Sequence, residues 1–199
     1  MNKKFCDVEN LSLNDAEKRG FEGEKEVNSH LVTLLKKGEY YLPGLLIPSN
    51  GDRFAEVDGI LITRRGIYCI EIKNWKGRIN GFENDEMWYK SKKKFTKQVK
   101  NPVIQNKYHC AAIERYLHFD YKVKNCVIFY STNDLSHIVS NCVFNLNTFD
   151  DFYFSKPQNV LSKRQIDYIY ELLSIYRVTR NEMKAYREEI KAKYSSVEY

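Results

Sequence analysis

The sequence predicts a single α/β domain, in which a mixed central sheet carries helices on both faces. Two aliphatic, β-branched runs, at 57–62 and 67–72, flank a turn and are apolar on both sides, which is typical of strands inside a layered domain. Runs with helical apolar spacing precede and follow these strands. The chain has 199 residues, 43% of them hydrophobic, which is enough for one domain with a core.

Residues 1–14 are predicted to form an arm ahead of the domain. Asn14 or Asp15 can cap a helix that is expected to run to about Lys37 and to stop at Gly38. The apolar stripe of this helix follows helical spacing and consists of Val27, Leu31, Leu34 and Leu35.

Glu24 lies one helical turn before this stripe, so it is expected to face the core rather than solvent. Gly20 and Gly23 stand beside it, at a cost to the helix of roughly 1 kcal/mol each relative to alanine. Small residues there would let another backbone, or a phosphate, approach closely. The alternative is that Glu24 forms an ion pair with a lysine such as Lys25 or Lys36.

The central hairpin turns at 63–66, and the last residue of the turn is a glycine, which suits positive φ. A loop of this length places Ile62 opposite Ile67. Counting back along both strands then places Asp58 opposite Glu71. Directly opposed residues share a face of the sheet, with Cβ atoms roughly 4.5–5.5 Å apart.

Lys73 lies two residues beyond Glu71 and shares that face. Two carboxylates this close repel each other, so either Asp58 or Glu71 would titrate at an unusually high pH. A bound cation resolves the repulsion, and oxygen ligands of this kind suit Mg²⁺. The spacing alone leaves a second interpretation open, a salt-bridged rim in which Lys73 neutralises Glu71. The apolar flanks favour the first, because a charge beside buried strands is costly unless it has a task.

Six lysines lie between residues 90 and 100. No apolar period runs through this segment, so we expect an exposed loop. It is either a solvated loop or a surface that follows a phosphate backbone. The candidate contacts with nucleic acid are Lys92, Lys93, Lys94 and Lys97.

Capping signals mark two further helices. Asn101 followed by proline predicts a helix to about Tyr116, with Gln105 in its first turn. Ser162 with Gln165 is a capping-box pattern for a helix toward Tyr194. The apolar stripe of that helix thins beyond residue 177, so its last part would break, protrude or pack on a partner. A loop with a short helix is expected at 147–160, and strands at 45–47, 78–82, 87–89, 125–130 and 141–146.

Composition narrows the class of protein. The net charge of +6 is a modest excess that is compatible with a polyanionic partner. No apolar run reaches the ~18 residues of a membrane span, and the N-terminal sequence is not that of a signal peptide. The five cysteines have no zinc-binding spacing with the four histidines and are expected to be reduced. A cytoplasmic protein without a membrane partner is expected.

Several segments together resemble the nuclease-related domain (NERD) family of the PD-(D/E)xK nuclease superfamily. An acidic residue ahead of a hairpin that ends in Glu-x-Lys is similar to the superfamily motif, with Asp58, Glu71 and Lys73 in those places. Glu-x-Lys alone is a weak signal, whereas an ordered set of segments is specific. The matching segments cover roughly residues 18–130 and are 20–24, 56–59, 66–74, Gly77, Trp88 and 101–105.

The resemblance implies a restriction-endonuclease-like fold and metal-dependent hydrolysis of phosphodiester bonds, with DNA as the expected substrate. It implies that Asp58, Glu71 and the backbone carbonyl of Ile72 hold Mg²⁺ or Mn²⁺. Glu24 would bind a second metal or its water. Lys73 would orient the attacking water and offset charge on the reacting phosphate.

The resemblance also implies that Gln105 positions water or the nucleic acid backbone, although an ordinary polar first-turn residue is the alternative. The nuclease domain is expected at 15–160, with a helical extension at 161–199 packed on the same domain. Two other functions remain open. One is a catalytically silent nucleic-acid-binding module, and the other is an interaction domain whose charged C-terminal helix docks on a larger DNA-processing partner or forms a homodimer.

Overall fold

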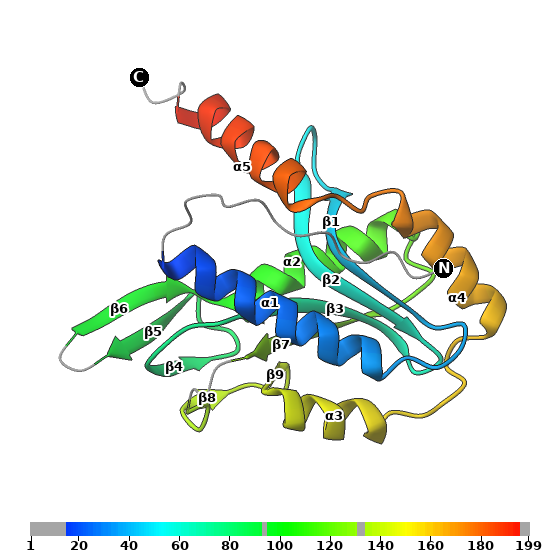
Figure 1. Cartoon of the computed structure of the whole chain (residues 1–199), viewed down its shortest axis with the longest axis horizontal. Coiled ribbons are helices and arrows are strands. Elements are labelled where there is room, and N and C mark those ends of the chain that lie inside the picture. The colour runs from blue at the N-terminus through cyan, green and yellow to red at the C-terminus, as the bar shows by residue number, and fades with distance from the viewer. Residues whose placement is uncertain (1–14, 93–94, 131–133, 196–199) are drawn as a thin grey trace.

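A five-stranded sheet forms the centre of the computed structural model, which describes residues 15–92, 95–130 and 134–195 (Figure 1). Strands β1, β2 and β3 are antiparallel, whereas β3 and β7, and β7 and β9, are parallel. The prediction of a mixed sheet in an α/β fold of restriction-endonuclease type is therefore confirmed. The strands follow the order β1 (Tyr40–Pro48), β2 (Phe54–Thr63), β3 (Gly66–Lys73), β7 (Val123–Phe129) and β9 (Val143–Phe144).

A second, four-stranded sheet has the order β6-β5-β4-β8. Figure 1 shows its β5–β6 hairpin projecting away from the central sheet. The expected loop at 90–100 is wrong for the residues described there, because they lie in two paired strands. Both faces of this hairpin are largely solvated, so no apolar alternation marks it in the sequence. The strands are β4 (Arg78–Phe82), β5 (Met87–Lys92), β6 (Phe95–Lys100) and β8 (Ile138–Val139).

Helices cover both faces of the central sheet. Helices α1 (Asp15–Thr33) and α3 (Leu146–Ser155) pack on one face, with Ile70 and Phe149 in their shared core. Helices α2 (Pro102–Tyr116) and α4 (Lys163–Ser174) pack on the other, where Ile60 belongs to the core. The prediction that the central hairpin is covered on both faces is confirmed, because its apolar side chains belong to the cores on both sides of the sheet.

The bounds of the observed elements differ from the expected ones in three parts of the chain. α1 ends at Thr33, and Gly38, at φ +79°, turns the chain into β1 rather than ending the helix. Most of 147–160 is helical, and the expected strand at 141–146 shrinks to β9. The long C-terminal helix is two helices, because the chain bends after α4 and resumes as α5 (Arg180–Ser195).

The segment before α5 fastens it to β1. The N–H of Val178 donates to the carbonyl of Gly44 at 3.0 Å. Met183 is buried, and the hydroxyl of Tyr186 accepts from the N–H of Phe54 at 2.8 Å. The predicted N-terminal arm at 1–14 lies outside the described residues. Among the helices described, none has the length and apolar content to span a membrane.

Candidate active site

The central hairpin brings two of the predicted carboxylates together. Its ladder of backbone pairs ends at Gly59 opposite Ile70, which confirms the predicted register. The next position in that register places Asp58 opposite Glu71. There the Asp58 side chain takes the place of a backbone partner, because its Oδ2 accepts a hydrogen bond from the N–H of Ile72 at 2.8 Å.

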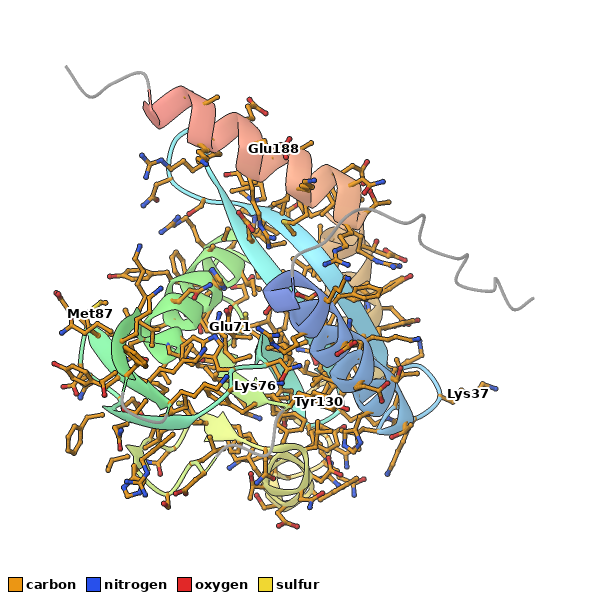
Figure 2. The ribbon with its side chains drawn as sticks, turned by 60° about the vertical axis from the view of Figure 1, so that its left-hand side comes forward. Lys37, Glu71, Lys76, Met87, Tyr130 and Glu188 are labelled. Atoms are coloured by element: carbon orange, nitrogen blue, oxygen red, sulfur yellow. The ribbon has the colours of Figure 1, made fainter. Side chains whose placement is uncertain are left out.

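Glu71 lies at the end of β3 and is only 2% exposed (Figure 2). Its Oε1 accepts from Nζ of Lys73 at 2.5 Å, and Nδ1 of His109 lies 3.4 Å from its Oε2. The second contact falls outside hydrogen-bond geometry, so within the described residues Oε2 and Nδ1 have no hydrogen-bond partner. The pair with Lys73 is the one that a salt-bridged rim would contain, but Glu71 is far more buried than a rim residue.

The two carboxylates have opposite pKa shifts. Burial, followed by the charge of Glu71, raises the pKa of Asp58 well above its usual range. Burial alone would also raise the pKa of Glu71, but His109 and Lys73 outweigh it and hold that pKa below its usual value. The structure therefore assigns the high-titrating member of the pair to Asp58, a choice that the spacing alone left open.

Helix α2 supplies the polar side of the site. Its cap is the predicted one, because Oδ1 of Asn101 accepts from the N–H of Val103 at 2.8 Å. Gln105 is exposed in the first turn, and its Oε1 lies 3.5 Å from Nζ of Lys73. His109 follows one turn later on the same side of the helix.

His109 is the site residue that the sequence interpretation missed. The available signal was its spacing of four residues from Gln105, which puts both on one side of α2. A buried amide fixes this helix in position, since Nδ2 of Asn106 donates to the carbonyl of Cys69 at 2.9 Å and to Oδ1 of Asn125 at 2.8 Å.

Helix α1 crosses the end of β3 and brings Glu24 to the site. Nδ2 of Asn74 donates to the carbonyl of Arg19 at 2.7 Å, and a Cβ at Gly23 would lie 2.7 Å from Cβ of Asn74. The predicted close approach therefore exists at Gly23, whereas Gly20 has no neighbour within 4 Å of such a Cβ. Burial raises the pKa of Glu24, and the charge of Glu71 contributes in the same direction.

A second close approach supports β2 beside Asp58. The ring of Tyr41 crosses Gly59, where any Cβ would lie 2.1 Å from the Tyr41 hydroxyl oxygen. That hydroxyl donates to Oδ1 of Asn28 on α1 at 2.5 Å. A glycine after Asp58 thus lets β1 and α1 close around the carboxylates.

The lysine-rich hairpin β5–β6 lies beside the site rather than in it. Lys92 and Lys97 are exposed on it, while Lys93 and Lys94 lie outside the described residues. Trp75 connects the two regions, because Nζ of Lys73 lies 5.8 Å from its ring centre and Nζ of Lys90 lies 5.7 Å from it.

The described residues contain no group of three or more His, Cys, Asp or Glu side chains arranged to hold a metal. The candidate donors are two carboxylates, Asp58 and Glu71, with the carbonyl of Ile72, the residue that follows Glu71. Mg²⁺ usually takes one or two carboxylates and completes its shell with water and phosphate oxygens. The donor set is thus compatible with a hard divalent cation whose remaining ligands come from solvent and substrate.

Comparison with known proteins places all five candidate catalytic residues inside one family segment. Residues 19–130, more than half of the chain, match the nuclease-related domain family. An uncharacterized protein of Bacillus anthracis is 31% identical over 96 residues, which make up 48% of this chain and 45% of that protein. The chain therefore spans less than half the length of this curated relative. No solved structure matches this chain. On the strength of the matched segment, the chain belongs to the nuclease-related domain family.

Proposed function

We propose that this protein is a metal-dependent nuclease that hydrolyses phosphodiester bonds in DNA. The observation that carries the proposal is the buried Glu71, paired with Lys73 and lying beside Asp58 in the segment that matches the nuclease-related family. Burying like charges together destabilises the fold. A bound cation and a phosphate would turn that arrangement into a binding site.

The proposed ligands for Mg²⁺ or Mn²⁺ are Asp58, Glu71 and the carbonyl of Ile72. Two observations support the assignment: Oε2 of Glu71 is buried without a hydrogen-bond partner among the described residues, and Asp58 accepts its hydrogen bond through Oδ2. Glu24 would bind a second ion or its water. When bound, the metal would polarise the scissile phosphate and lower the pKa of its bound water.

The polar side chains around the carboxylates would position the reactants. Lys73 lies between Glu71 and Gln105. Its ammonium would donate to an attacking water and to a phosphate oxygen that gains charge in the transition state. Gln105 offers both donors and an acceptor to the same water or to the nucleic acid backbone. His109 would hold Glu71 in orientation.

The β5–β6 hairpin would follow the phosphate backbone outward from the site. Of its described lysines, Lys92, Lys97 and Lys100 are exposed, and Lys90 and Lys73 share the ring of Trp75. Lysine contacts with phosphates supply sequence-independent affinity by releasing counterions. We therefore propose Lys92, Lys93, Lys94 and Lys97 as nucleic acid contacts.

A cleavage assay tests the proposal. The purified protein is incubated with plasmid and with single-stranded DNA in Mg²⁺, Mn²⁺, Ca²⁺ or EDTA, beside a Glu71→Gln variant. We expect cleavage with Mg²⁺ or Mn²⁺, and none in EDTA or with the variant. Cleavage that survives both EDTA and Glu71→Gln contradicts a metal-dependent reaction at this site.

A second candidate function is a nucleic-acid-binding module without catalysis. The observation in its favour is that Lys73 and His109 already stand against the two oxygens of Glu71, an arrangement that a silent site would share. DNA binding without cleavage in any of the metals, together with an unchanged melting temperature on adding Mg²⁺, would support this function.

A further inference from the structure

Helix α5 carries two arginines beside the candidate site, although it lies outside the residues that match the family. Arg180 and Arg187 are seven residues apart, close to two helical turns, so they point to the same side of α5. In Figure 2 α5, labelled at Glu188, lies on one side of Glu71, and β5, labelled at Met87, lies on another.

Arg187 approaches the site along β2. Its Nε donates to Oε2 of Glu56 at 2.5 Å. Glu56 and Asp58 are two residues apart on one strand, so their side chains share a face of the sheet at a spacing of roughly 6.6 Å. Arg187 is therefore held at Glu56, the neighbour of Asp58 on the same face of β2.

Arg180 approaches the site along α1. Its guanidinium carbon lies 4.3 Å from the ring centre of Phe21. Phe21 and Glu24 are three residues apart on α1, which makes their side chains neighbours on the helix surface. Arg180 and then Arg187 are also the cations that oppose most strongly the rise that burial causes in the pKa of Glu24.

Both guanidinium groups have donors to spare. An arginine carries five N–H donors. Within the described part of the chain, Arg187 donates a hydrogen bond through Nε only, and its side chain is 60% exposed. Arg180 is exposed and stacks on Phe21 without donating a hydrogen bond to any described residue. Exposed planar forks of this kind match phosphate oxygens.

The docking of α5 does not depend on these arginines. Tyr186 exchanges hydrogen bonds with both the N–H and the carbonyl of Phe54, and Met183 is buried beneath the helix. Val178 adds a backbone bond to Gly44. Exposed ion pairs such as Arg187–Glu56 contribute little to stability by comparison.

We propose that Arg180 and Arg187 bind the phosphates of a nucleic acid strand on the α5 side of the carboxylates, while the β5–β6 lysines bind it on the other side. The C-terminal helix thus completes the nucleic acid surface of the site. This inference rests on the proposed function for the identity of the ligand, but it requires binding and not turnover.

The test measures binding of the full chain to fluorescent single-stranded and duplex oligonucleotides in EDTA, across a salt series from ~50 to ~200 mM. The variant Arg180→Gln/Arg187→Gln is compared with Arg164→Gln/Lys193→Gln. The control also removes two positive charges, one from α4 and one from the C-terminal end of α5. We expect the log–log salt slope of the first variant to fall by about 1.4 for single strands or 1.8 for duplex, and the control slope to stay unchanged.

Two conservative changes separate phosphate binding from a structural role. Arg180→Lys/Arg187→Lys should keep most of the salt slope, because the charges remain. Glu56→Gln removes the carboxylate that competes for Arg187, so it should tighten DNA binding, whereas an anchoring role predicts looser docking of α5 and no gain in affinity. Where cleavage is measurable, the double glutamine variant should raise KM more than it lowers kcat.

An unchanged salt slope in the folded double glutamine variant overturns the inference, even when the wild type cleaves DNA. Absence of DNA binding by the wild type overturns it as well. Loss of the slope in a protein that does not cleave DNA supports the arginines while contradicting the nuclease proposal, so the two failures are distinguishable.

Discussion

The two sheets of this molecule hold their charges in opposite settings. In β3 every residue before Lys73 is buried, Glu71 among them. In β5 and β6 only Trp88 is buried; Lys92, Lys97 and Lys100 are exposed, and Lys90 is half-buried. A buried ion costs several kcal/mol unless it is paired, whereas an exposed one changes stability by about 0–1 kcal/mol. Substitutions in the central sheet should therefore alter chemistry and stability together, and those in the second sheet should alter binding alone.

The largest effect on activity is expected at Asp58, which tests most directly the contrast between the buried charges of the central sheet and the exposed charges of the second sheet. Asp58→Asn can still accept the hydrogen bond from Ile72, but it removes one of the two charges. We expect cleavage to fall by orders of magnitude and the Mg²⁺-induced rise in melting temperature to shrink, because that rise comes from binding to the native state. In EDTA the variant should be as stable as the wild type or more so. Differential scanning fluorimetry and a cleavage assay measure the three effects.

The pH dependence gives this prediction a sign. Because the native pKa of Asp58 is raised, the native state binds more protons than the unfolded state, and stability falls as pH rises from the unfolded pKa of about 3.9 through the raised one. The advantage of Asp58→Asn in EDTA should therefore be absent below about pH 4 and grow above it. Asp52→Asn, in the exposed β1–β2 loop, is the matched control. A destabilised Asp58→Asn with an unchanged Mg²⁺ shift would rule out a metal site there.

Glu24 should show the next largest effect. Burial raises its pKa, so Glu24→Gln removes a charge that the fold tolerates poorly and should leave metal-free stability equal or higher. Cleavage should drop by about 10–100-fold if Glu24 orients a metal or its water. Glu26→Gln, on the exposed side of the same helix, is the control. Activity within a few-fold of wild type would make Glu24 a structural residue.

His109 should have a smaller effect, of the opposite sign for stability. It helps to hold the pKa of Glu71 low, so Glu71 contributes stability that is present above its unfolded pKa of about 4.3 and is lost as pH falls through the native pKa. His109→Leu should raise the pKa of Glu71 and destabilise the protein at neutral pH by about 1.4 kcal/mol for each unit of that rise, with the difference fading in acid. Carboxyl NMR titration and thermal melts in EDTA measure both, and His109→Gln should recover part of the loss.

The sequence predicted the central hairpin well because register is a matter of counting. The turn at 63–66 and strand alternation determine which residues face each other, so Asp58 and Glu71 could be paired without coordinates. The fold class followed from the same buried strands. The helix N-termini followed from local caps, whose hydrogen bonds the structure contains at Asn101 and Ser162.

Contacts between distant segments could not be predicted in this way. His109 meets Glu71 only because Asn106 fixes α2 against β3 and β7, a tertiary arrangement that the helical period of α2 does not encode. The arginines of α5 reach the site because the chain bends after α4. The β5–β6 hairpin was not predicted, because strands that are exposed on both faces show no alternation of apolar and polar residues in the sequence.

The smallest effect on stability is expected in that hairpin. Replacing Lys92, Lys93, Lys94 and Lys97 by glutamine should leave the melting temperature nearly unchanged, since exposed charges contribute little. The salt dependence of DNA binding should flatten, by up to ~0.9 log–log units for each lost phosphate contact. A matched control removes four exposed cations elsewhere, at Lys36, Lys37, Lys122 and Arg164. Lys37 lies on the side of the molecule away from Met87 (Figure 2). Equal slopes for the two quadruple variants would mean that the hairpin lysines are solvated and do not bind phosphates. Of the two sheets, only the central one would then contribute to function.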